Sequence, residues 1–239
     1  MSRRPGPGAL ALWFVPVAFT YFLVAPALPA LPSGDLEVLV AGAIGLLLVA
    51  ATTLSLLGAR DSLGGPLLIA LGSGLLVGAL SAQGAAGVGA GANVFEAMLA
   101  AAIGLLFARV LHAPVIALAV PLFVAAIDVW ATAGGPASRV AAGGGGVGDP
   151  LSFDLPAWGG MGSAGHLGVS DAVFLSMFAA WTCHLGFRRA ATIAGLVLGL
   201  LASLVLGLAL DRAIPALPLI AAGYLLPNAD RIVRVLRHG

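Results

Sequence analysis

The chain has 239 residues, of which 60% are hydrophobic and only 9% are charged, and its formal net charge is +1. A soluble domain needs roughly a quarter of its residues charged, so this composition excludes a water-soluble globular protein and predicts a polytopic membrane protein. The balanced charge gives no indication of nucleic acid binding, and a single cysteine, Cys183, excludes an internal disulfide.

A helix needs about 20 apolar residues to cross the hydrocarbon core of a bilayer. By this measure the sequence predicts an all-α bundle of about eight transmembrane spans. We expect these spans at 9–31, 36–58, 66–84, 94–111, 113–132, 168–187, 190–210 and 214–229. The first resembles a signal peptide, but its apolar run is too long for one, so an uncleaved span is expected.

The spans fall into two predicted parts. Residues 1–112 are expected to form an N-terminal scaffold of four spans, and residues 113–239 to form the half that carries the chemistry. Between the fifth and sixth spans, residues 133–167 are polar and rich in glycine, which predicts a long mobile loop.

The arginines predict the orientation in the membrane. With the N-terminus in the cytoplasm, only Arg139 and Arg212 of the 11 arginines lie outside. Positive residues prefer the cytoplasmic side, so we expect both termini there and the long loop outside. The predicted protein is therefore an integral protein of a cell membrane, expected to be prokaryotic.

Small residues recur at spacings that favour close helix packing. In the seventh span Gly195, Gly199, Ser203 and Gly207 follow one another every four residues, and the third span has Gly74 and Gly78. Such a stripe predicts a groove in which another helix approaches the backbone closely.

Two of the ten acidic residues are exceptional, because Asp128 and Asp171 lie about a turn inside predicted spans. Both are expected at a similar depth below the outer face. A carboxylate within a span is costly unless it is paired, protonated or hydrated, so it usually marks function. Two that meet share one proton, which is the state that an aspartyl protease requires. Capping or snorkelling at the interface, and ion or proton transport, remain open at this point.

At these residues the chain resembles the presenilin and signal peptide peptidase family of intramembrane aspartyl proteases. "IDVW" places Asp128 as the first acid of that family, "GVSD" places Asp171 as the second, and "IPALPLIAAGYLLP" supplies a Pro-Ala-Leu motif. Ile127 stands where the family usually has tyrosine, and Ser170 stands where it usually has glycine. The resemblance covers roughly residues 114–229.

The resemblance implies a catalytic pair, Asp128 and Asp171, and a set of substrate-binding residues: Gly168, Ser170, Pro215, Ala216 and Leu217. It implies transmembrane segments of other proteins as substrates, within the lipid bilayer and without cofactor or metal. Three alternatives remain: a small proton-coupled carrier that uses the same aspartates, a prepilin peptidase, and an inactive relative that acts as a membrane chaperone. His166 is expected to be a solvated loop residue and Glu96 an interfacial one.

Overall fold

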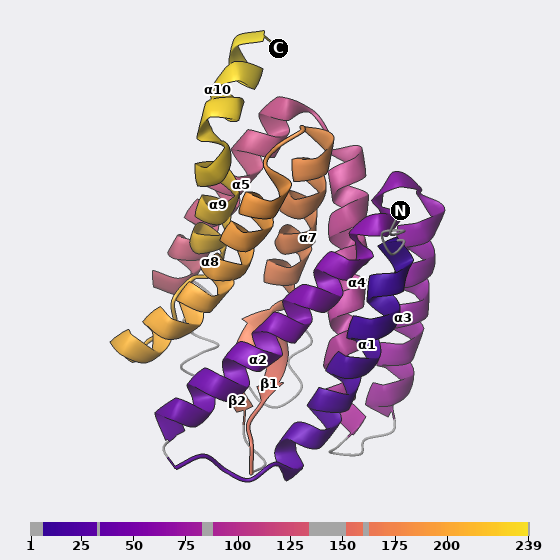
Figure 1. Ribbon diagram of the computed structural model, residues 1–239, viewed down its shortest axis with the longest axis vertical. Helices are drawn as coiled ribbons and strands as arrows, with labels where there is room; N and C mark the ends of the chain where they lie inside the picture. Colours follow the sequence, from indigo (N-terminus) through magenta and orange to yellow (C-terminus); the bar gives the residue numbers. More distant parts are fainter. Residues whose placement is uncertain (1–6, 33, 83–87, 134–151, 160–162, 239) are drawn as a thin grey trace, which may run out of the picture. The chain divides into compact units, whose positions relative to one another are not determined.

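The computed structural model describes residues 7–32, 34–82, 88–133, 152–159 and 163–238, and this part of the chain is mostly helical (Figure 1). Its contacts divide the chain into two compact units. The first comprises Met1–Phe107 and Pro150–Met177, and the second comprises Ala108–Asp149 and Phe178–Gly239. The hairpin and the start of α7 thus belong to the same unit as the N-terminal helices. The two predicted parts, 1–112 and 113–239, are instead continuous in sequence.

The first unit contains four helices that precede a β-hairpin. They are α1 Pro7–Val24, α2 Gly34–Ser55, α3 Gly64–Ala82 and most of α4 Val88–Val110, with 3-10 turns η1 Ala25–Ala27 and η2 Leu56–Asp61. The strands β1 Ser152–Pro156 and β2 Ser163–Gly168 are antiparallel, and α7 Val169–His184 follows β2 directly.

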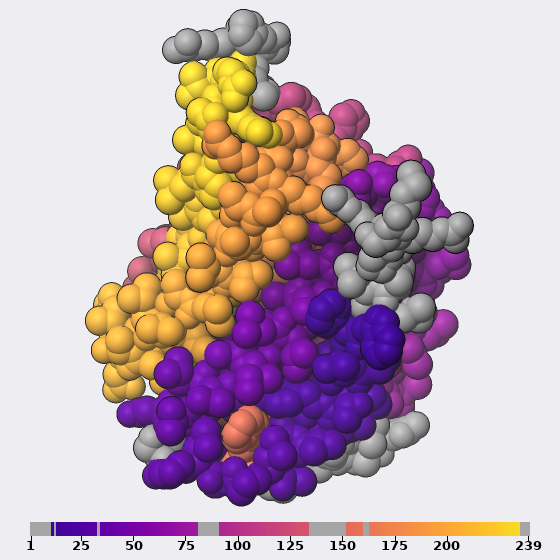
Figure 2. All heavy atoms as spheres, viewed as in Figure 1, coloured from indigo at the N-terminus to yellow at the C-terminus, as the bar shows by residue number. Residues whose placement is uncertain are grey.

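The hairpin corrects two predictions, that of an all-α fold and that of a long mobile loop over 133–167. Phe153 and Leu155 on β1 are buried, and so are Ala164 and Leu167 on β2. The side chain of Leu155 packs against Gly45 of α2, where an added Cβ would lie 3.0 Å from its Cδ2. Figure 2 shows only a small patch of the hairpin, in salmon, among indigo and purple atoms of the N-terminal helices. The remainder of the predicted loop, 134–151 and 160–162, lies outside the described residues.

The hairpin is held by polar contacts as well. Asn93 of α4 donates a hydrogen bond from Nδ2 to the carbonyl oxygen of Asp154, at 2.7 Å. The indole nitrogen of Trp158 donates to the hydroxyl oxygen of Tyr21 at 3.1 Å, and that hydroxyl donates to the carbonyl of Ala41. These bonds satisfy polar groups that would otherwise be costly among apolar helices.

The second unit is built from α5 Pro114–Ala133, α8 Arg189–Leu210, α9 Leu217–Leu225 and α10 Ala229–His238, with the C-terminal part of α7 and a 3-10 turn, η3 Leu226–Asn228. Its core is aromatic: Phe178 stacks on Tyr224 with ring centroids 5.1 Å apart and on Trp181 at 5.9 Å. All three side chains are fully buried. α8 ends at Asp211, which adopts a left-handed conformation, and α9 begins after a stretch without helix or strand at 213–215.

The predicted spans are confirmed in part. Four described helical segments are long and apolar enough to cross a membrane: Gly34–Asp61, Gly91–Val110, Pro114–Ala133 and Arg189–Leu210. The apolar segments Trp13–Ala27 and Gly64–Leu80 are shorter. α7 has 16 residues and α9 only nine. Pro215 lies in the stretch without helix before α9, whereas Pro218 is the second residue of α9, a position in the first turn that proline fits. The orientation of the termini and the number of about eight spans stay predictions.

The small-residue stripe of α8 contacts α9 over half of its length. A Cβ added at Gly199 would lie 2.6 Å from the carbonyl oxygen of Leu219, and Gly195 faces the backbone of Gly223 equally closely. Gly207 meets only the carbonyl of Arg212, at 3.5 Å. The expected close approach is thus confirmed at Gly195 and Gly199. A Cβ added at Gly74 or Gly78 would meet no described atom within 4 Å apart from its chain neighbours and its own helix backbone, so this pair shows no close approach in the described part of the chain.

We expect Gly199→Ala to destabilise the second unit, because the new methyl group would collide with backbone atoms, which cannot rotate away. Overpacking of this kind costs about 1–3 kcal/mol. Gly207→Ala is the matched control on the same helix, and it should be neutral or stabilising because alanine favours helix. Thermal unfolding of both variants in detergent would check this, and equal midpoints would contradict the close approach.

Candidate active-site residues

Asp128 lies near the C-terminal end of α5 and is half-buried. Its Oδ2 atom accepts a hydrogen bond from the backbone N–H of Leu217, at 3.0 Å. Leu217 is the first residue of α9. The first N–H groups of a helix have no partner within the helix and carry partial positive charge, so a carboxylate there is favourable. The structure therefore joins the first predicted acid to the leucine of the Pro-Ala-Leu motif, 89 residues away.

The rest of that motif forms the turn before α9. Ala216 precedes the helix, and its carbonyl oxygen accepts hydrogen bonds from the N–H groups of Leu219 and Ile220, at 3.1 and 3.0 Å. Pro215 lies in the irregular stretch, and both Pro215 and Ala216 are half-buried. Ile127, beside the first acid, is 45% exposed.

The bond to Leu217 predicts a difference between two variants of Asp128. Asp128→Asn keeps an oxygen acceptor, whereas Asp128→Ala leaves the N–H of Leu217 without this partner. We expect the alanine variant to be less stable than the asparagine variant by about 1 kcal/mol. Helix propensity acts in the opposite direction, since alanine is the better helix former. The same two substitutions at Asp35, exposed in the first turn of α2, control for propensity. If Asp128→Ala unfolds at a higher temperature than Asp128→Asn, the hydrogen bond to Leu217 has no energetic role.

Asp171 lies in the first turn of α7, and its residue is 9% exposed. Its Oδ2 atom accepts a hydrogen bond from the backbone N–H of Gly168, three residues earlier, at 3.2 Å. This is the reach of a carboxylate at the third helical position back to the residue before the helix. Local structure thus accounts for an acid at the start of an apolar helix, since Asp171 caps it.

The small residues before Asp171 are close to its carboxyl group. A Cβ added at Gly168 would lie 3.2 Å from Oδ2 of Asp171 and 3.2 Å from Oγ of Ser170. Ser170 is exposed, and Gly168 is half-exposed at the end of β2. A larger residue at Gly168 would crowd the carboxyl group, which gives a local reason for glycine at this position.

The two acids belong to different compact units. Asp171 lies in the first unit and Asp128 in the second. Each carboxyl group has a defined setting within its own unit, formed by a backbone N–H donor near the start of a helix. That the two carboxyl groups meet stays a prediction.

A pair of ionisable side chains that sequence reasoning missed lies on the hairpin. His166 and Asp154 are register partners, and Nδ1 of His166 is 2.6 Å from Oδ1 of Asp154. Glu96 of α4 lies within electrostatic range of Asp154. His166 is half-exposed, as expected of a loop residue, but it has a partner. The hairpin register would have been needed to find it, because 12 residues separate the two in sequence.

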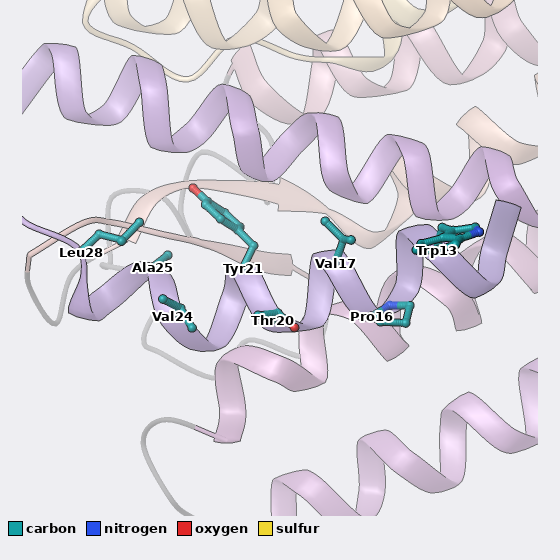
Figure 3. Close-up of a pocket in the computed structure, with 8 residues that line it drawn as sticks. All are labelled: Trp13, Pro16, Val17, Thr20, Tyr21, Val24, Ala25 and Leu28. Atoms are coloured by element: carbon teal, nitrogen blue, oxygen red, sulfur yellow. The ribbon is translucent and has the colours of Figure 1, made fainter.

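An open groove of about 580 Å³ lies along α1 (Figure 3). Its described lining is Trp13, Pro16, Val17, Thr20, Tyr21, Val24, Ala25 and Leu28. In Figure 3 the ring of Tyr21 points toward the strands, whereas Val24 and Thr20 point to the opposite side of the helix. The lining is mostly apolar and includes none of the predicted site residues, so this groove adds no catalytic group.

The charged groups at the other end of the second unit are structural partners. Arg188 donates two hydrogen bonds to the carboxylate of Asp230, at 2.6 and 2.9 Å, and one to the carbonyl of Pro227. These bonds hold the pKa of Asp230 below its usual 3.8. A carboxyl group with a lowered pKa stabilises the fold above its unfolded pKa and loses that contribution as the pH falls through the folded pKa.

We therefore expect Asp230→Asn to lower the unfolding midpoint slightly at neutral pH. The difference from the wild type should shrink below about pH 4, where the wild-type carboxyl group begins to be protonated as well. Midpoints measured from pH 7 to pH 3 would check this. Arg188→Gln should have the same effect, and the double variant should be no less stable than either single one. A difference that persists unchanged at pH 3 would contradict the role of the ion pair.

Among the described residues, no group of three or more His, Cys, Asp or Glu side chains is arranged to hold a metal ion. No family model, curated protein or solved structure matches the chain.

Proposed function

We propose that the protein is an intramembrane aspartyl protease in which Asp128 and Asp171 activate water to cleave transmembrane segments. The observation that carries the proposal is the hydrogen bond from Leu217 to Asp128. It ties an acid within a membrane-length helix to the first residue of α9, in the Pro-Ala-Leu motif where the resemblance expects substrate contact.

The two carboxyl groups have similar settings, and both suit this chemistry. Each accepts a backbone N–H on its Oδ2 atom, which restricts its rotamer. Preorganised groups spend less free energy on orientation during the reaction. An ordered carboxyl group in a mostly apolar setting also favours sharing of a proton with a second one.

In the proposed reaction one carboxylate removes a proton from water while the oxygen of that water bonds to the carbonyl carbon of the peptide. The protonated partner gives its proton to the carbonyl oxygen, which yields a neutral tetrahedral diol. The aspartate that took the proton from water then gives it to the amide nitrogen, while the other carboxylate takes a proton from one hydroxyl of the diol. The C–N bond breaks to give a carboxylic acid and an amine, and the pair is again singly protonated. The pair titrates as a unit, so either aspartate can begin as the base.

Substrate binding is proposed for the small and irregular segments next to the two acids. Gly168 and Ser170 are small residues next to Asp171, and residues 213–215 before Ala216 have backbone groups outside helix or strand. An unwound substrate can pair its backbone with such a segment. Substrates with helix-breaking residues near the scissile bond should therefore be preferred.

The proposal is tested with the full chain in vesicles and a transmembrane peptide that carries a fluorophore and a quencher. Cleavage that requires both aspartates supports the protease. Proximity is tested independently by Asp128→Cys with Asp171→Cys in a variant that has Cys183→Ser. A disulfide between the two positions supports a dyad, and failure of every short cross-linker to join them would refute it.

A proton-coupled carrier is the second candidate, favoured by the ionisable side chains of His166, Asp154 and Glu96 outside the proposed dyad. Groups of this kind form proton relays in transporters. Proton flux into vesicles that depends on Asp128 and His166, with every tested peptide intact, would select the carrier.

A further inference from the structure

The junction of α8 and α10 in the second unit gathers positive charge. Arg188 and Arg189 stand at the start of α8, and Arg231 and Arg234 lie on α10. Arg188 binds Asp230, and its backbone N–H donates to the side-chain oxygen of Asn228 at 2.9 Å. Arg231 donates to the carbonyl oxygen of Gly186. These bonds fix the beginning of α10 beside the beginning of α8.

The charge at this junction is unbalanced. The described residues of the junction include four arginines and one aspartate, so Arg188, Arg189, Asp230, Arg231 and Arg234 sum to +3. Asp230 is shared between Arg188 and Arg234, which lie 2.6 and 3.2 Å from it. The sequence adds Arg237 to the same helix, one turn further on.

α10 is also amphipathic. In "ADRIVRVLRH" the arginines at 231, 234 and 237 recur every three residues, and the aliphatic residues lie between them. At helical spacing this pattern separates a basic face from an apolar one. Val233 on the apolar face is 46% exposed, and Leu226, just before the helix, is 74% exposed. A short basic amphipathic helix of this kind favours a membrane surface.

The position of the junction also agrees with binding to a membrane surface. α8 is one of the helices long enough to cross a membrane, and it begins at Arg189. The junction therefore lies at the end of a span, where phospholipid headgroups are found. Anionic headgroups are complementary to its charge, and each arginine near such a surface contributes about 1 kcal/mol. A second copy of the chain would bring the same positive charge and is disfavoured.

We propose that the arginine junction, Arg188, Arg189, Arg231 and Arg234, binds the headgroups of anionic phospholipids and holds α10 at the membrane surface. Arg188 orients α10 through Asp230, and Arg189, Arg231 and Arg234 meet the phosphates. The apolar face of α10 then contacts the acyl boundary. This inference does not depend on the proposed protease activity.

The test is native mass spectrometry of the full chain in detergent, titrated with phosphatidylglycerol or phosphatidylcholine. The protein should bind phosphatidylglycerol more tightly, and the preference should weaken as salt is added because the attraction is screened. Arg189→Gln should weaken phosphatidylglycerol binding about fivefold, and the triple change of Arg189, Arg231 and Arg234 to glutamine on the order of 100-fold. The corresponding triple lysine variant keeps the charge and should retain binding.

Arg212→Gln is the matched control, because Arg212 follows the opposite end of the same helix. It should leave lipid binding unchanged. Equal affinity for the two lipids, or an equal loss in Arg212→Gln and Arg189→Gln, would overturn the proposal. Displacement of the lipid by inorganic phosphate at the same concentration would indicate a phosphate site and would overturn the proposal. So would the loss of a dimer, rather than of lipid, in the glutamine variants, because it would indicate that a second copy of the chain binds here. Unchanged unfolding midpoints of the glutamine variants show that the fold is kept.

Discussion

Replacing either Asp128 or Asp171 with asparagine is expected to abolish cleavage of a transmembrane peptide. Asparagine has nearly the same shape as aspartate and keeps an oxygen that can accept the N–H of Leu217 or of Gly168. It can neither remove a proton from water nor donate one as an acid. General acid–base catalysis contributes about 10²–10⁴-fold, and the remaining carboxyl group has no partner with which to share a proton.

The measurement is the initial rate of fluorescence increase with the protein in vesicles, at equal amounts of folded protein. Asp211→Asn is the matched control, because this exposed residue has a left-handed backbone conformation that asparagine also tolerates. It should keep the wild-type rate. Substantial activity in either Asp128→Asn or Asp171→Asn would exclude the aspartyl mechanism. Loss of proton flux instead of cleavage would favour the carrier.

Shortening Phe153 to alanine is expected to destabilise the first unit by about 3–5 kcal/mol, the range for large buried aromatic residues. Phe153 lies on β1 with no exposed surface, in the segment that composition alone marks as a loop. Its removal would leave a cavity among helices whose packing is otherwise dense. Because β2 leads directly into α7, loosening the hairpin should also lower the activity that depends on Asp171.

Phe107→Ala is the matched control for this prediction. Phe107 belongs to α4 of the same unit but is 49% exposed, so its removal leaves a smaller void. The unfolding midpoints of both variants and hydrogen exchange of residues 152–168 would check the difference. The hairpin is not part of the core if Phe153→Ala has the same unfolding midpoint as the wild type and the hairpin amides exchange freely in both of these proteins.

The presence of an acid at Asp171 is evident from the sequence, whereas its setting depends on the folded structure. The run "GVSDAVFLSMF" is apolar, so an acid within it stands out in the sequence. That Asp171 lies in the first turn depends on where β2 ends and α7 begins. The alternation in "SFDLP" was a signal for a half-buried strand, but five residues beside a glycine-rich stretch are too few to distinguish a strand from a loop.

For this protein the sequence alone determined the membrane-like composition and the long apolar helices, because length and hydropathy are local properties. Only the tertiary structure decided that Gly199 rather than Gly207 meets α9, that His166 meets Asp154, and that Leu217 binds Asp128. In helices that are apolar on every side, hydrophobicity does not mark the face that contacts protein, so these contacts depend on the packing of segments far apart in the chain.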